Sequence, residues 1–94
     1  MTRYLIRIEL DRAASSEYEK LHESMELLKF YKIITGDDGR NFQLPQGTYS
    51  GYSYESSDQV LNRIKSVANP LSYGDAAIIV TKISKWSAWL IPSK

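Results

Sequence analysis

The chain is organised around a central stretch, residues 31–54, that is expected to form two strands, and one helix and one terminal strand lie on each side of it. Strands are expected where side chains alternate between apolar and polar or are β-branched and aromatic. These segments are residues 4–10, 30–35, 48–54 and 76–83. The order of elements is the strongest constraint on how the chain folds.

The two helices are expected between the first and second strands and between the third and fourth. Ser16 followed by Glu19 fits a capping box, which predicts the start of the first helix. Ser56 or Ser57 begins the second helix, and Pro70 forbids its continuation. Each helix carries one apolar stripe, so each is expected to cover a sheet.

This order predicts an α+β fold of the ferredoxin-like βαββαβ type. Right-handed crossovers would place both helices on one face of a four-stranded antiparallel sheet, with the first and third strands central and the other face free. A short C-terminal extension follows the last strand. With 94 residues and 43% hydrophobic content, residues 1–94 are expected to form a single domain around one core.

The central stretch contains a reversal and an irregular link. The sequence Gly36-Asp37-Asp38-Gly39 is typical of a turn, and residues 40–47 predict a partly irregular arm. Gly51 within the third strand indicates either a β-bulge or a close approach of another backbone or a ligand, and the bulge is favoured.

Composition excludes several classes of protein. The absence of cysteine rules out disulfides, thiolate nucleophiles and Cys-based zinc sites. No segment approaches the roughly 20 apolar residues of a membrane span, so we expect a cytoplasmic protein without membrane insertion. A net charge of +1 means that any contact with nucleic acid must come from a local patch.

His22 is the only histidine and the first candidate for acid–base chemistry, with Lys20 beside it on the first helix. The alternative is that His22 is a surface or boundary residue, as a lone helical histidine commonly is. Metal ligation by His22 is not expected, because the chain has no second histidine or cysteine. No cofactor is expected.

The acidic residues allow two interpretations. Asp37 and Asp38 are either oxygen ligands for magnesium or turn formers, and the turn is favoured. Glu9 and Asp11 close the first strand, where they either bind a divalent metal or simply end the strand.

Tyrosines on the third strand suggest a surface for nucleic acid. Aromatic rings with an arginine on an open sheet face stack bases and pair with phosphate, which indicates Tyr49, Tyr52, Arg7 and, in the reversal, Arg40. Because side chains alternate along a strand, Tyr49 faces one way and Tyr52 the other, so some of the tyrosines belong to the core. Trp86 and Trp89 in the extension either pack on the body or form a partner surface.

Residues 4–54 resemble the type V toxin-antitoxin endoribonuclease antitoxin family, whose fold is similar to that of the CRISPR-associated small ferredoxin-like nucleases. The shared features are the segments YLIRIE (4–9), FYKII (30–34) and QLPQGTY (43–49), the serine-started first helix with Leu21 and Leu27-Leu28, and the turn at Gly39. The resemblance implies a monomeric or homodimeric antitoxin that cleaves the messenger RNA of a small membrane-damaging toxin. Where such relatives carry arginines on the first helix, this chain has Lys20 and His22.

Two hypotheses follow. The first is a metal-independent or weakly metal-assisted endoribonuclease, in which His22, Lys20 and Arg7 move protons and stabilise phosphate charge. The second is a non-catalytic module that binds RNA or protein through the tyrosine-bearing face, a sheet edge or the tryptophan-containing extension.

Overall fold

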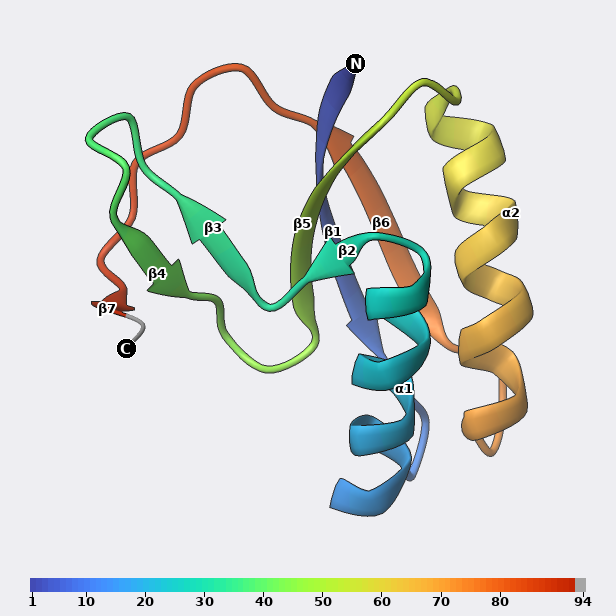
Figure 1. The fold of residues 1–94 in the computed structure, drawn as a ribbon. Helices are drawn as coiled ribbons and strands as arrows, with labels where there is room; N and C mark the ends of the chain where they lie inside the picture. The colour runs from blue at the N-terminus through green and yellow to red at the C-terminus, as the bar shows by residue number, and fades with distance from the viewer. Residues whose placement is uncertain (93–94) are drawn as a thin grey trace.

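The computed structural model describes residues 1–92 and has a mixed α+β architecture (Figure 1). Its strands are β1 (Thr2–Glu9), β2 (Phe30–Tyr31), β3 (Ile33–Thr35), β4 (Asn41–Gln43), β5 (Thr48–Ser53), β6 (Ala77–Lys82) and β7 (Ile91–Pro92). Its helices are α1 (Ser15–Leu27) and α2 (Ser57–Ala68), and α2 continues into a short 3₁₀ turn, Asn69–Leu71.

The main sheet has four strands in the order β2-β5-β1-β6, and every neighbouring pair is antiparallel. The first and third expected strands, β1 and β5, are therefore central, as the sequence predicts. Ile6 on β1 lies opposite Tyr49 on β5 and Val80 on β6.

The core lies between this sheet and the two helices, which cover the same face (Figure 1). Alternate residues of β1 point into it, and the helices supply the opposing apolar stripe. The buried cluster consists of Tyr4, Ile6, Ile8, Leu10, Leu21, Met25, Phe30, Tyr49, Val60, Ile64 and Ala68.

A second sheet of three strands, in the order β3-β4-β7, lies on the side of the main sheet away from the helices (Figure 1). It corrects one expectation, because the second expected strand divides at Lys32. The arm at residues 40–47 is only partly irregular, as expected, and contains the short strand β4, and the extension contributes β7. Because the Ser50 hydroxyl donates to the Ile33 carbonyl at 2.7 Å, β3 is held over β5. The helix-free face is therefore only partly open.

The N-terminus of α1 begins earlier than the sequence suggests. Ala14 is the N-cap, and the carboxylate of Glu17, not Glu19, accepts from the Ala14 amide at 3.2 Å. Ser16 lies inside the first turn, where its hydroxyl donates to Glu17. The reciprocal contact requires a residue three positions after the cap, and Glu17 holds that position.

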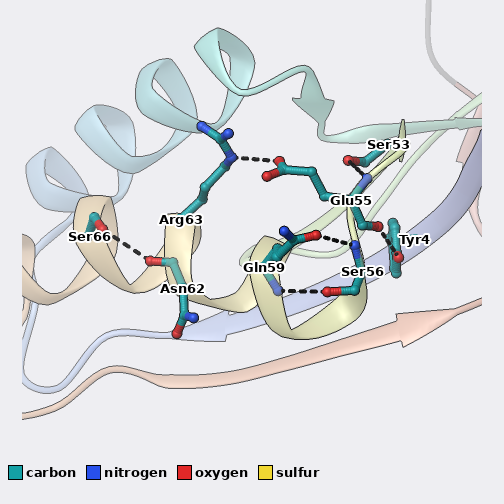
Figure 2. Close-up of polar contacts among 8 residues, drawn as sticks. All are labelled: Tyr4, Ser53, Glu55, Ser56, Gln59, Asn62, Arg63 and Ser66. Carbon is teal, nitrogen blue, oxygen red and sulfur yellow. Dashed lines mark hydrogen bonds and ion pairs between the residues drawn. The ribbon is translucent and has the colours of Figure 1, made fainter.

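The N-terminus of α2 follows the sequence prediction. Ser56 is the N-cap, its hydroxyl accepts from the Gln59 amide at 3.2 Å, and the Gln59 side chain accepts from the Ser56 amide at 2.9 Å (Figure 2). The Tyr4 hydroxyl donates to the Glu55 carbonyl at 2.6 Å, which ties this cap to β1. Arg63 completes the arrangement through an ion pair with Glu55 at 2.5 Å.

Gly51 is not at a bulge, because the pairing of β5 with β1 is continuous from Thr48 to Ser53. The close approach of another backbone explains the glycine instead. A Cβ at this position would lie 2.4 Å from the carbonyl oxygen of Lys29 and 2.6 Å from Cδ1 of Phe30. The absence of a side chain lets the chain enter β2 directly beside β5.

Candidate nucleic-acid interface

Two adjoining hollows lie where the second sheet meets the helix-free face of the main sheet. The first, of about 620 Å³, is lined by Lys29, Tyr31 and Tyr52, together with Arg3, Gly36 and Asp37. The second, of about 470 Å³, is lined by Phe42, Lys85 and Trp86, together with the same three residues. Because the two hollows share Arg3, Gly36 and Asp37, they form one continuous depression, called here the Arg3 groove.

Arg3 occupies the middle of this groove. Cross-strand pairing sets Arg3 on β1 opposite Tyr52 on β5, so both side chains lie on the helix-free face. The guanidinium carbon is 5.4 Å from the centre of the Tyr52 ring, and Nη2 donates to the Thr35 carbonyl at 2.9 Å. The buried Nε–H has no acceptor among the described residues. The guanidinium thus holds the second sheet to the first.

A third, smaller hollow of about 250 Å³ extends the groove toward the C-terminal segment. It shares Phe42 and Trp86 with the second hollow and adds Arg40 and Trp89. The Arg40 guanidinium lies 5.3 Å from the centre of the Phe42 ring. Aromatic rings and cations therefore line all three hollows.

The acidic turn contributes both a structural and a free carboxylate to this surface. Asp38 accepts from the Arg40 amide at 3.0 Å and from its Nε at 2.9 Å, and these bonds hold the pKa of Asp38 below its usual value. Asp38 is thus a turn former, which is the interpretation that the sequence favours. Asp37 is exposed and lines both main hollows, where it opposes the cations.

The structure separates the residues that sequence analysis assigned to nucleic acid. Tyr52 and Arg40 line the depression, as described above. Arg7 is exposed on the same face of β1 as Arg3 but lines neither main hollow. Tyr49 is fully buried on the helix-covered face, so its expected position on the open face is wrong. Tyr49 is on the same face of β5 as Gly51, which pairs with Tyr4, whereas Tyr52 is on the other face.

His22 lies on the opposite side of the main sheet, where its Nδ1 forms a hydrogen bond with the Tyr49 hydroxyl. The two ring centres are 5.6 Å apart. Burial, followed by the neighbouring Tyr18, raises the pKa of Tyr49, so the phenol stays protonated near neutral pH. Because a protonated phenol needs an acceptor, the hydroxyl donates to Nδ1 and the imidazole proton lies on Nε2.

The charge state of His22 follows from its surroundings. Burial is the main cause that lowers its pKa, and Lys32 lowers the pKa further, whereas Glu19 and Glu26 raise it. The imidazole is therefore neutral at pH 7. Lys20 is exposed on the same helix. The sheet separates both residues from Arg7, so the three do not form one cluster.

Of the remaining acidic candidates, Asp11 has structural partners. Asp11 accepts from the Gly74 amide at 3.1 Å, and its own amide is bonded to the Ser72 hydroxyl at 2.7 Å. Glu9 is exposed at the end of β1. Within residues 1–92, no three His, Asp or Glu side chains are grouped so as to hold a metal ion. Within the same range, no helix has the length and apolar character to cross a membrane.

Sequence analysis missed the roles of Arg3 and Lys85. Arg3 could have been found, because it has the same parity on β1 as Arg7 and stands opposite Tyr52 once the strands are paired. Trp86 was left open between packing and partner contact, and it is half-buried in the wall of the second hollow. Trp89 is completely exposed.

A comparison with known families supplies a match over almost the whole chain. The family described as GhoS, Endoribonuclease GhoS, matches residues 1–89. No curated protein matches the chain.

Proposed function

Because this chain belongs to the GhoS endoribonuclease family, we propose that it is an endoribonuclease that acts as an antitoxin on the messenger RNA of a toxin. The match to residues 1–89 carries the proposal, since it includes both helices and every strand except β7. We also propose a cytoplasmic location, where messenger RNA is available, and a monomeric or homodimeric state.

The fold proposed for this function is the ferredoxin-like arrangement that the sequence predicts. The strand order β2-β5-β1-β6 and the placement of both helices on one face support it. The second sheet is then an addition inserted between the second and third strands of that arrangement and completed by β7.

The Arg3 groove is the proposed RNA side of the enzyme. Cleavage by attack of a 2′-hydroxyl on the adjacent phosphorus needs cations near the phosphorane oxygens and a group that accepts the hydroxyl proton. Arg3, Lys29 and Lys85 line the groove and provide cations that neutralise phosphate.

His22 and Lys20 remain the proposed residues for proton transfer and phosphate stabilisation. The edge strand β2 offers a route from the groove to this side of the sheet. Lys29, just before β2, lines the first hollow, and Lys32, just after it, lies close enough to His22 to lower its pKa. An RNA strand that follows these two lysines around the edge of the sheet would reach His22.

One observation favours the second candidate function, a module that binds RNA without cleaving it. In the tautomer inferred from the Tyr49 contact, Nε2 of His22 already carries a proton, and Nδ1 is occupied by the Tyr49 hydroxyl. His22 can then accept a substrate proton only after Tyr49 releases Nδ1.

Cleavage of end-labelled toxin messenger RNA, with and without a chelator, separates the two functions. We expect internal cleavage in both conditions, and we expect His22→Ala to lower the rate about 100-fold or more, as loss of an acid–base group does. Lys20→Ala is expected to lower it less. Lys65→Ala, an exposed lysine of α2, is the control. Equal rates in all four proteins would remove both residues from the mechanism, and binding without cleavage would establish the module.

A further inference from the structure

We propose that the Arg3 groove binds unpaired RNA, with one base in each hollow and Arg3 at the phosphate between them. This inference rests on the proposed function for the identity of the ligand as RNA. It goes beyond that function by specifying the strandedness of the substrate and the residues that select it.

The shape of the groove supports two neighbouring binding positions. The hollows of about 620 and 470 Å³ both fall within the range of roughly 300–1,000 Å³ that is common for small-ligand pockets. Arg3, Gly36 and Asp37 line both of them. A ligand that fills both hollows would therefore contact Arg3 in each.

The aromatic lining favours a single strand over a duplex. Tyr31 and Tyr52 line the first hollow, and Phe42 and Trp86 line the second. Ring faces of this kind stack on bases, which is possible only when the bases are not already stacked and paired within a helix. A duplex presents its phosphates and sugars outward and would leave these rings unused.

The charges of the groove match an RNA backbone whose phosphates run along it. Lys29 lines the first hollow, Lys85 the second, and Arg3 both. Among the carboxylates of the acidic turn, Asp38 is held by Arg40, and Asp37 forms no ion pair within residues 1–92, so it is the opposing charge. The cations thus outnumber the unpaired carboxylate along the groove.

Arg3 has the chemistry required of the central contact. A guanidinium is planar, stays charged at all relevant pH values and presents several donors to phosphate oxygens. Here Nη2 donates to the Thr35 carbonyl, and Nε–H is buried, so a phosphate would be met by the other N–H groups of the guanidinium. A phosphate between the two hollows would meet a cation that the protein has already positioned over Tyr52.

Fluorescence anisotropy with 2′-O-methyl oligoribonucleotides tests this inference without depending on cleavage, because methylation removes the nucleophile. The two probes are a short unstructured strand and a hairpin of the same length. We expect the unstructured strand to bind about tenfold more tightly, and we expect Arg3→Ala and Trp86→Ala each to weaken its binding about tenfold.

Arg12→Ala is the matched control. Arg12 also stacks on a tyrosine, at 4.2 Å from the centre of the Tyr73 ring, but it lines none of the three hollows. The control therefore removes the same charge and the same kind of stack outside the groove. If Arg3→Ala does not fold, Tyr52→Ala and Lys85→Gln replace it, since both side chains are exposed.

Equal binding of strand and hairpin, or equal losses from Arg3→Ala and Arg12→Ala, would overturn the inference. Failure of the proposed function gives a different result, namely selective binding of the unpaired strand with no cleavage of unmodified RNA. Cleavage of unmodified RNA that continues unchanged in both Arg3→Ala and Trp86→Ala would refute the groove while leaving the enzyme intact.

Discussion

Tyr49 and Tyr52 lie three residues apart on β5, and their rings lie on opposite faces of the main sheet. Tyr49 is 0% exposed and contacts the imidazole of His22, whereas Tyr52 is 51% exposed and contacts the guanidinium of Arg3. Each tyrosine is thus paired with one basic side chain. Because Tyr49 is buried, its hydroxyl needs a hydrogen-bond partner inside the protein. Because Tyr52 is exposed, a face of its ring remains accessible to a ligand.

The largest effect is expected from Tyr49→Ala. Removing a fully buried aromatic ring should lower the free energy of unfolding by about 3–5 kcal/mol, a large part of the stability of a small domain. Urea denaturation measures this loss, with Tyr52→Ala as the matched variant, expected to cost about 1 kcal/mol or less. Similar losses for both variants would break the distinction between the two tyrosines.

The next effect is on RNA affinity. Tyr52→Ala should weaken binding of an unpaired strand by roughly 1–3 kcal/mol, the usual contribution of one base–aromatic stack. Tyr54→Ala is the control, because Tyr54 is 87% exposed and lines none of the three hollows. Titration of both proteins with the same labelled strand gives the comparison, and equal affinities would show that Tyr52 is not a stacking residue.

A double-mutant cycle tests the contact on the helix-covered face. His22→Ala should cost about 1–3 kcal/mol of stability, because it leaves the buried Tyr49 hydroxyl without its acceptor. In a Tyr49→Phe background, the same substitution should cost less, since no hydroxyl remains to satisfy. Thermal or urea unfolding of the wild type, the two single variants and the double variant gives the coupling free energy between His22 and Tyr49. Strict additivity would mean that the hydrogen bond contributes nothing.

The same histidine should make stability depend on pH. Its pKa in the folded state is below the value of about 6.5 expected for the unfolded chain, so the unfolded chain takes up the proton first as the pH falls. The free energy of unfolding should therefore decrease from about pH 7 to pH 5, and less so in His22→Gln. The lowered pKa values of Glu17 and Asp38 act at lower pH. A wild-type protein that gains stability over this range would contradict the assignment.

The smallest effect is expected from Asp37→Asn. Removing the unpaired carboxylate from the groove should tighten binding of the unpaired strand about two- to threefold, as exposed charge interactions are weak. The gain should shrink at high salt. Glu23→Gln on α1 is the control, because Glu23 is exposed outside the groove. Weaker binding in Asp37→Asn would mean that the carboxylate contacts the RNA directly.

Alternation along β1 and the helical stripes were sufficient to predict the main sheet, its central strands and the apolar faces of β1 and of the two helices. They were not sufficient to divide residues 30–35, because Phe30 to Thr35 contains no residue that breaks a strand. The division at Lys32 depends on contacts made much later in the chain, from Leu44 to the Lys32 carbonyl and from Ser50 to the Ile33 carbonyl. Strand propensity does not specify the partner of a strand.

The candidate site was harder to predict for the same reason. Tyr52 and Arg40 were selected by residue type, but Arg3 and Trp86 are far apart in sequence and line one hollow only in the folded chain. Tyr49 was misplaced because register, rather than composition, decides which tyrosine of β5 faces the helices.

Gly51 connects these observations. Its position beside the Lys29 carbonyl is the point at which the end of α1, the start of β2 and the floor of the first hollow meet. Even a single methyl group there would push β2 outward. Both the helix-covered face that carries His22 and the Arg3 groove would then move with β2. A side chain at this one position would therefore disturb both surfaces together.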